Sequence, residues 1–350
     1  MAGQPGHPGV RAANGRERGG ERSTLSGSTG GSSGGEDEFV HQPVMAREVV
    51  ELLRPVPPGL VVDATVGGGG HARLLLSARP DLTLLGIDRD PEAVAAATVA
   101  LAEFGNRVRV VHGGFEDIAQ IVATESEGNV MGILFDLGVS SPQLDRPARG
   151  FSYWAEAPLD MRMDGGQTLT AATVVNDYDE DRLAELIAEN GEERFAREIA
   201  KRIVARRPLE TTGELVDAIK DAIPAPARRR GGHPARRTFQ AIRMEVNREL
   251  PHLEVGLDES VHLLKPEGRV LVLAYHSLED RRVKQLFAEE SVTADPVPPG
   301  LPVEPVRRTP LLRVLTRRAR RPAADEVAAN PRSKSARLRA AERVAAGTGS

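Results

Sequence analysis

The sequence predicts a doubly wound α/β fold with a mostly parallel sheet that is interrupted by a helical insert. Short apolar runs alternate with helical stretches from residue 60 to residue 136. Between residues 145 and 240 only helical periodicity is found, and a further apolar run follows at 269–275. Strands as apolar as these are buried on both faces, which is typical of a parallel sheet with helices on each side.

Three of the four strands expected before the insert end in an acid. Asp63, Asp88 and Asp136 each close an apolar run. Asp90 and Pro91 then suit the cap and first turn of a helix. The expected strands are 60–63, 82–88, 108–111, 130–136, 269–275 and a final antiparallel strand at 311–316.

The insert is expected to contain three helices, at 181–188, 192–206 and 213–223. Thr212 is the expected cap of the third helix, and Pro224 ends it. After the insert we expect one long helix over 239–264, kinked at Pro251, and another over 278–289. From about Pro322 the pattern indicates irregular chain.

Composition excludes several classes of protein. The chain has 350 residues and no cysteine, so disulfides and thiolate zinc sites are excluded, and we expect no metal centre. No apolar run approaches the length of a membrane helix, and no secretory segment is recognised, so a cytoplasmic protein without membrane contact is expected.

The net charge of −4 conceals an uneven distribution. Residues 305–350 hold twelve Lys and Arg against three acids, and residues 228–250 hold seven Arg against two acids. Basic segments on an acidic body suggest a polyanionic partner such as nucleic acid, although a solvated tail explains them equally well.

The run Gly67–Gly70 after the first strand favours a nucleotide cofactor, since it lets a ligand approach the backbone at a helix start. Asp88 lies where an acid reaches ribose hydroxyls. A dinucleotide enzyme would space its glycines as G-x-G-x-x-G. Here the glycines are consecutive, and three strand-end acids suit a cationic cofactor, so the pattern favours S-adenosylmethionine (SAM) over NAD.

The loop after the fourth strand, Asp136 to Gln143, is expected to face the reacting end of that cofactor. Its Ser141-Pro142 is half of the Ser/Asp/Asn-Pro-Pro-aromatic motif that amino-methyltransferases use to polarise a poorly nucleophilic amine. Aromatic residues follow at Phe151, Tyr153 and Trp154. Each could stack a displaced base, worth about 1–3 kcal/mol, or pack in a core.

His276 follows the fifth strand and could contact a base or a phosphate, although a lone histidine is more often structural. Ser277 is the expected cap of the next helix, with Asp280 as its capping-box partner.

In several blocks of its sequence the chain resembles the ribosomal RNA small subunit methyltransferase H family, the 16S rRNA cytosine-N4 methyltransferases. The resemblance runs from residue 41 to residue 339 and leaves out only the N-terminal tail. Gly68 stands where many members have Arg or Tyr, and the tail is an extension. The matching blocks are 41–44, 69–72, 88–91, 136–145, 149–152, 159–164, 237–249, 275–282 and 330–339.

The resemblance implies a class I (Rossmann-like) SAM methyltransferase that methylates N4 of a decoding-centre cytidine in 16S rRNA of the small ribosomal subunit. The residues implied to contact SAM are Gly69, Gly70, His71, Asp88, Phe115, Asp136 and Gln143. We expect direct methyl transfer, with Asp136, Ser140 or Ser141 polarising the amine. Candidate RNA contacts are Phe151, Tyr153, Arg162, Arg237, Arg243, His276 and Arg281, and for the arginines structural salt bridges are an equal alternative.

Five segments are expected along the chain. Residues 1–38 are rich in Gly and Ser and nearly free of large apolar side chains, so we expect a disordered tail. The other segments are a first, SAM-binding methyltransferase part at 39–144, a helical insert for substrate recognition at 145–240, a second methyltransferase part at 241–321 and a basic C-terminal tail at 322–350.

Two other functions are compatible with the sequence. One is a DNA amino-methyltransferase, against which the incomplete Ser-Pro motif argues. The other is a non-catalytic RNA-binding ribosome assembly factor, against which Asp88, Asp136 and Ser140 argue. A monomer and a homodimer are both compatible with the sequence.

Overall fold

The computed structural model describes residues 43–229, 232–294 and 308–345, and these belong to one compact unit. The tail expected at 1–38 lies outside the described residues. Among those described, none of the helices combines the length and the apolar character that crossing a membrane requires. The division into domains stays a prediction.

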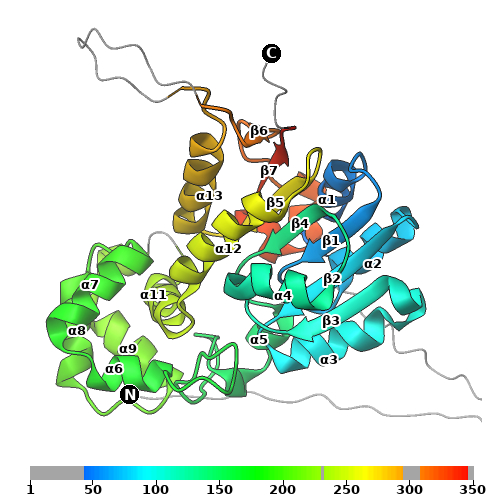
Figure 1. The fold of residues 1–350 in the computed structure, drawn as a ribbon. Coiled ribbons are helices and arrows are strands. Elements are labelled where there is room, and N and C mark those ends of the chain that lie inside the picture. Colours follow the sequence, from blue (N-terminus) through cyan, green and yellow to red (C-terminus); the bar gives the residue numbers. More distant parts are fainter. Residues whose placement is uncertain (1–42, 230–231, 295–307, 346–350) are drawn as a thin grey trace, which may run out of the picture. The chain divides into compact units, whose positions relative to one another are not determined.

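Seven strands form one sheet in the order β3-β2-β1-β4-β5-β7-β6 (Figure 1). The first five are parallel to one another, as predicted. Their order, with β1 in the middle and the chain winding outward in both directions, confirms the doubly wound fold. The parallel strands are β1 Gly59–Asp63, β2 Leu82–Asp88, β3 Val108–His112, β4 Val130–Asp136 and β5 Arg269–Ala274.

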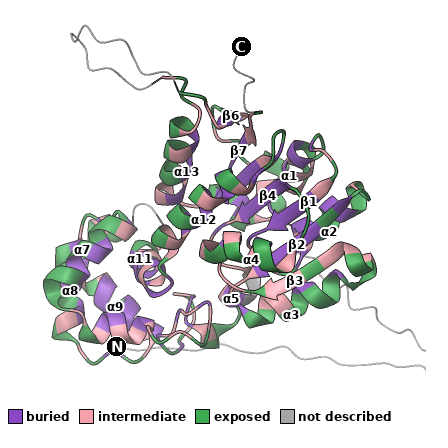
Figure 2. Cartoon of the chain, in the orientation of Figure 1, coloured by how far each residue is buried: buried purple, intermediate pink, exposed green. Residues whose placement is uncertain are grey.

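Alternate residues of each strand face opposite helical layers. Val62 and Ile133 pack with α4, α12 and α13, whereas Val61 and Leu134 pack with α1 and α2. Figure 2 shows the strands as mostly buried and the outer faces of the helices as exposed. The helices of these layers are α1 Ala46–Leu53, α2 Gly70–Ala78, α3 Pro91–Ala100, α4 Ile118–Glu125, α12 Glu249–Leu263 and α13 Ser277–Glu289.

The C-terminal segment departs from the expectation of irregular chain after Pro322. β7 Arg337–Arg343 lies between β5 and β6 Leu312–Val314 and is antiparallel to both. A solvated tail was one alternative for its arginines, but Arg337 and Arg339 both pair with Asp280. Leu338, Ala340 and Ala341 are completely buried. Before β7 lie α14 Ala324–Ala329 and the 3₁₀ helix η4 Pro331–Ser335.

The insert is helical, as predicted, and has a hydrophobic core of its own. Its third helix begins one residue earlier than expected, because Thr211 caps it in a capping box with Glu214. Thr212 is instead buried, and its hydroxyl donates to the Ala155 carbonyl at 2.7 Å. The helices are α6 Ala171–Asp177, α7 Glu180–Gly191, α8 Ala196–Ala205, α9 Thr212–Ala222, α10 Ala225–Arg228 and α11 Arg236–Val246.

The single helix expected over 239–264 is two helices, α11 and α12. The break is at Arg248, whose φ of 49° is left-handed, and not at Pro251. The side chain of Asn247 holds the break by donating to Met161 O at 2.8 Å and accepting from Met163 N at 2.8 Å. Pro251 lies in the first turn of α12, where a helix does not need its N–H.

Candidate functional site: an acidic cluster at the carboxyl edge of the sheet

The three predicted acids do meet at one edge of the sheet, because β2, β1 and β4 are adjacent. Asp63 lies opposite Gly86 and Leu134, so Asp88 and Asp136 stand two residues nearer the edge on the same face. Asp63 therefore forms the floor of the cluster, and the other two carboxylates stand above it.

The glycine turn fits over this cluster. Gly67 and Gly69 have left-handed φ values of 51° and 81°, which let the chain bend back between β1 and α2. The Gly67 amide donates to Asp88 Oδ2 at 2.8 Å, so the turn is attached to the end of β2. Among the described residues, no atom beyond those of its chain neighbours lies within 4 Å of where a Cβ of Gly68 would be, which leaves room for a larger side chain.

Burial disfavours the ionised form of the carboxyl groups in this site. Loss of solvent, reinforced by the nearby Asp136 carboxylate, raises the pKa of Asp63 to about 8. Burial also raises the pKa of Asp88, even though the amides of Asp90 and Gly67 donate to it. The raised pKa values mean that the ionised carboxylates have too little positive charge around them to be stabilised. A cationic ligand would supply that charge and would be stabilised here.

Asp136 is held by three neighbours from different elements. The Tyr275 hydroxyl donates to Asp136 Oδ1 at 2.8 Å, and Thr65 Oγ1 accepts from the Asp136 amide at 2.6 Å. His71 Nδ1 lies 3.6 Å from Asp136 Oδ2, and the other nitrogen of the ring lies 2.9 Å from Val44 O. Burial and Asp136 together keep the pKa of Tyr275 well above its ordinary value, so Tyr275 stays a donor.

Sequence reasoning missed Thr65 and Tyr275 as parts of this site. Thr65 follows a strand-end acid by two residues, and Tyr275 is the first residue after β5. A polar side chain at the end of a parallel strand is the signal that identified the acids, and it also marks these two residues.

The loop after β4 brings Ser140 and Gln143 together. Gln143 is buried, and its Oε1 accepts from the Ser140 amide at 3.0 Å, while its Nε2 donates to Asp90 Oδ2 at 3.0 Å. Gly138 has a φ of 98° and packs against the Tyr275 ring. The loop is therefore tied to the start of α3 and to the end of β5. The side chain of Ser141 lies outside the described part of the structure.

Phe115 lies beside the end of β2, at the start of the 3₁₀ helix η2 Phe115–Asp117. Its ring meets Phe135 edge-on with centroids 5.6 Å apart, and the Arg89 guanidinium lies 5.3 Å from its centroid. The amide of Gly113 donates to the Asp88 carbonyl at 2.9 Å, which anchors this segment next to Asp88. The ring is half-buried, as a residue that covers a flat ligand would be.

The predicted base-stacking rings have different environments. Phe151 is only 6% exposed and belongs to the core of the insert, which corrects its expected role as a stacking surface. Tyr153 is half-buried between Phe239 and His233. Trp154, the third ring expected either to stack a base or to pack in a core, is 76% exposed.

Two of the predicted phosphate-binding arginines are engaged within the protein. Arg243 forms a bidentate ion pair with Glu249, with both distances 2.8 Å and both side chains largely buried. Arg162 pairs with Asp160 and also donates to two carbonyls of its own loop. These contacts favour the salt-bridge alternative for both.

Arg237 and Arg281 remain accessible and meet at one residue. Arg237 donates to the Glu192 carbonyl at 3.0 Å, and Arg281 donates to the Glu192 carboxylate at 2.9 Å. The Ser277 hydroxyl and Arg281 together lower the pKa of Glu192. The start of α13 is thereby joined to the insert.

His276 is itself the cap of α13, with Glu279 as its capping-box partner, which corrects the expected pair of Ser277 and Asp280. His276 Nε2 lies 3.0 Å from Glu279 Oε1. Glu249, His276 and Glu279 bring possible ligand atoms within 4.8 Å of one another. Arg243 already binds Glu249, and backbone amides bind Glu279, so contacts within the protein account for the position of these side chains without a metal.

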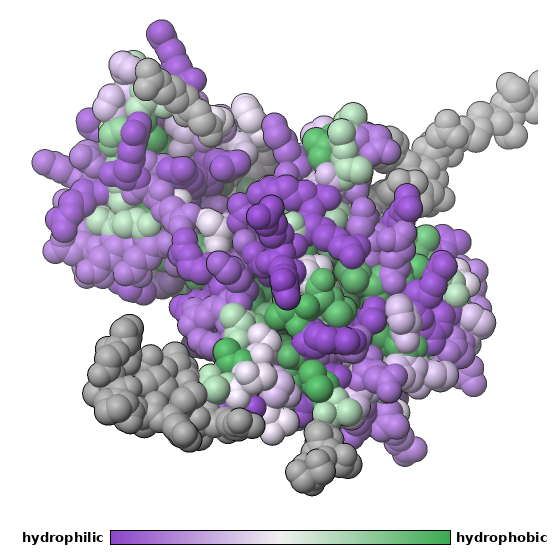
Figure 3. Space-filling view, turned by 90° about the horizontal axis from the view of Figure 1, so that it is seen from above, coloured by the Kyte–Doolittle hydropathy of each residue, from purple (hydrophilic) through white to green (hydrophobic). Residues whose placement is uncertain are grey.

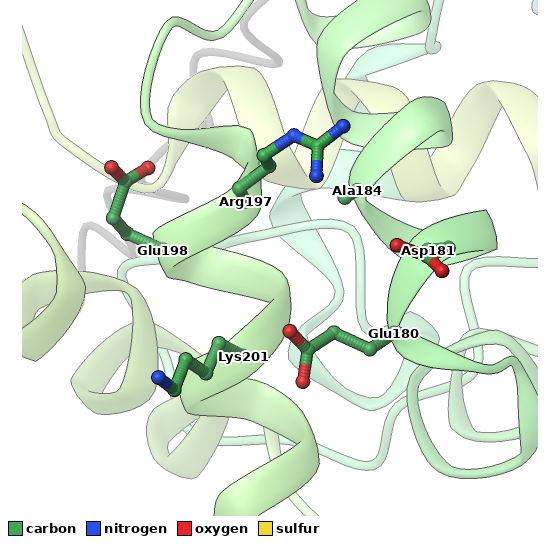
Figure 4. A pocket seen from close by; sticks show the side chains of 6 residues that line it. All are labelled: Glu180, Asp181, Ala184, Arg197, Glu198 and Lys201. Atoms are coloured by element: carbon green, nitrogen blue, oxygen red, sulfur yellow. The ribbon is translucent and has the colours of Figure 1, made fainter.

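Two hollows lie away from the acidic cluster. One of about 170 Å³ lies between α7 and α8 and is lined by Glu180, Asp181, Ala184, Arg197, Glu198 and Lys201 (Figure 4). A larger one of about 600 Å³ is lined by α7, α11, α12 and α13 and includes Arg182, Arg248 and Arg282. Neither contains a strand-end acid, and the charges that line each are mixed.

The known proteins to which this chain is similar are named as methylases or methyltransferases. A family model described as the MraW methylase family matches residues 38–344. A protein of Mycolicibacterium gilvum named ribosomal RNA small subunit methyltransferase H is 52% identical over 88% of this chain and 84% of its own length. One of the same name from Thermobifida fusca is 52% identical over 87% of this chain and 93% of its own length.

Proposed function

Because the chain belongs to the MraW methylase family and is a methyltransferase with SAM as its cofactor, we propose that it methylates N4 of a decoding-centre cytidine in 16S rRNA of the small ribosomal subunit. The observation that carries the proposal is the meeting of Asp63, Asp88 and Asp136 under the glycine turn and beside the Ser140 loop. The curated relatives are named for small-subunit ribosomal RNA.

The residues of the cluster fit SAM. The carboxyl groups of Asp63 and Asp136 suit its cationic amino and sulfonium groups. Asp88 accepts one backbone N–H at each oxygen and keeps lone pairs for a ribose diol. Gly69 and Gly70 form the start of α2, and Phe115 can cover an adenine. His71 and Gln143 act as supports, through Asp136 and Asp90 respectively.

Bound SAM supplies an electrophilic methyl group, and the protein has to make the cytosine amine nucleophilic. Asp136 and the Ser140 hydroxyl are the groups that we expect to accept the N–H hydrogens of that amine, which returns electron density to the nitrogen. Tyr275 fixes the orientation of the Asp136 carboxylate through one of its oxygens. The contribution of these residues is positioning and fixed electrostatics rather than covalent catalysis.

An RNA acceptor agrees with the distribution of charge. Hydrophilic side chains cover most of the face shown in Figure 3, with smaller hydrophobic areas between them. Arg317, Arg318, Arg320 and Arg321 are exposed, and within the described part of the chain no acid pairs with them. An rRNA acceptor also implies a cytoplasmic protein that meets the ribosomal subunits there, whether it acts as a monomer or as a homodimer.

The proposal is tested by methyl transfer from labelled SAM to three acceptors: small-subunit particles, naked 16S rRNA and DNA. We expect N4-methylcytidine in one of the two ribosomal acceptors and none in DNA. Asp136→Ala should lose the activity and still fold. Label in DNA alone would support a DNA amino-methyltransferase, and tight subunit binding without any transfer would support an assembly factor.

A further inference from the structure

Trp154 is the only tryptophan of the chain, and its ring contacts two other rings. Its ring centroid lies 5.3 Å from that of Tyr153 and 4.6 Å from that of His233. Tyr153 and His233 stack on each other at 4.6 Å with an interplanar angle of 13°. Tyr153 also meets the buried Phe239 edge-on at 5.7 Å. The exposed indole is therefore attached to the core of the insert through two other rings.

The backbone around Trp154 is also fixed. The Trp154 amide donates to Ser152 Oγ at 3.2 Å. On its other side the Ala155 carbonyl and the Ala157 amide both bond to the Thr212 hydroxyl, at 2.7 and 3.0 Å. A large aromatic ring that is held in place and left 76% exposed is ready to stack on a flat partner.

Positive charge flanks His233 in the sequence. Arg228 and Arg229 precede His233, and Arg236 follows it, with its amide donating to the His233 carbonyl at 3.1 Å. All three arginines are exposed, and no acid of the described residues pairs with them. Burial lowers the pKa of His233, so its ring stacks as a neutral group. Aromatic rings beside unpaired arginines are the combination that single-stranded nucleic acid recognises.

We propose that the Trp154 surface, formed by Trp154, Tyr153, His233, Arg228, Arg229 and Arg236, binds a single-stranded segment of the RNA substrate and stacks one unpaired base on the indole. The inference rests on the proposed function, because it takes RNA as the substrate. The contacts of Trp154 belong to the insert, whereas those of Asp136 are Thr65, His71 and Tyr275. We therefore take the stacked base to be a different one from the methylated cytidine.

The emission of Trp154 reports on this surface directly, because no other tryptophan contributes. The experiment titrates the full chain with oligoadenylate and oligouridylate of about twelve nucleotides, within the usual site size for single strands. Stacking should quench the emission, and more strongly with adenine than with uracil at equal salt. Anisotropy of end-labelled RNA measures binding independently in the same samples.

Variants separate stacking from folding. Trp154→Ala should weaken RNA binding by roughly 5- to 100-fold, the equivalent of losing one base–aromatic stack. Trp154→Phe should restore most of that affinity. Val99, which is 78% exposed on α3, provides the matched control, since Val99→Ala also removes an exposed apolar side chain and should change nothing.

Three results would overturn the inference. The first is RNA binding that leaves the emission unchanged, and the second is a Trp154→Ala variant that binds like the wild type. The third is emission that depends on protein concentration without RNA, which would assign the ring to a contact between two copies of the chain. If the enzyme methylates RNA and the tryptophan emission does not respond, this inference fails while the proposed function stands. If RNA quenches the emission and no methylation is found, the proposed function fails while RNA binding at this surface stands.

Discussion

Asp63 is more deeply buried than the two other acids at the sheet edge, and its pKa of about 8 has a consequence for stability. The folded protein holds the Asp63 proton more tightly than the unfolded chain, where the pKa has its ordinary value near 3.8. The stability that this proton provides is complete below about pH 4 and is lost as the pH rises through about 8.

Replacing Asp63 with Asn should therefore flatten the pH dependence of stability. Between about pH 6 and pH 9 we expect the variant to gain about 2–3 kcal/mol relative to the wild type, since a tenfold difference in proton affinity between the folded and unfolded chains corresponds to about 1.4 kcal/mol. Urea unfolding of both proteins at several pH values measures the difference. Parallel pH profiles for the two proteins would show that Asp63 is an ordinary carboxylate.

The Tyr275 hydroxyl should matter for catalysis rather than for folding. Tyr275→Phe keeps the ring that packs on Gly138 but removes the donor to Asp136. A hydrogen bond to a charged group contributes about 1.5–3 kcal/mol, so its loss from the transition state should lower kcat about 10- to 100-fold, whereas Tm should fall no further than in a variant that loses an equivalent hydroxyl. Tyr178→Phe is the matched control, because its hydroxyl donates to Glu245 in the insert. An equal loss of kcat in both variants would contradict the role given to Tyr275.

At the scale of elements, β7 is the part of the fold that sequence patterns did not reveal. It lies inside the sheet, and Leu338 is completely buried there. Leu338→Ala should destabilise the protein by about 2–5 kcal/mol, as truncation of a buried leucine usually does. Leu74→Ala, at a position 41% exposed on α2, should cost far less. Guanidinium unfolding compares the two, and equal small effects would mean that β7 is not part of the stable sheet.

The difference between predicted and missed elements has a physical cause. The strands that end in Asp63, Asp88 and Asp136 were predictable because each is a continuous apolar run, buried by neighbours on both faces. In contrast, β7 depends on partners far away in the sequence, such as Asp280 for Arg339. The break between α11 and α12 likewise depends on bonds from Asn247 to Met161 and Met163. Local pattern carries no information on contacts of this kind.

In the candidate site, too, the features set by local sequence were predictable and those set by distant contacts were not. The acids and the glycine turn follow from strand ends and local sequence, and they do lie together. Whether an aromatic or basic side chain is free depends on the whole fold. Phe151 is used in the core and Arg243 in a buried ion pair, whereas the ring left exposed is Trp154.

For the whole molecule, the arginines at 317, 318, 320 and 321 should contribute to RNA binding through charge alone. The bridge between Arg320 and Leu338 places them level with the end of β5, because Leu338 lies opposite Leu273. Replacing all four with Gln should weaken binding to every RNA sequence similarly and reduce the salt slope by up to about 3, at about 0.7 per phosphate contact.

The control for this prediction replaces three exposed arginines that pair with acids elsewhere on the molecule, namely Arg47, Arg73 and Arg109. Their replacement with Gln should leave the salt slope nearly unchanged. If both sets of substitutions reduce the slope equally, the attraction comes from net charge and not from a defined surface.

The central claim is most directly tested by mapping N4-methylcytidine in 16S rRNA from cells with and without this gene. We predict that the modification disappears at a single cytidine when the gene is deleted. The wild-type gene should restore it, and a gene carrying Asp88→Ala should not. An unchanged map after deletion, or full restoration by the Asp88→Ala variant, would contradict the proposed function.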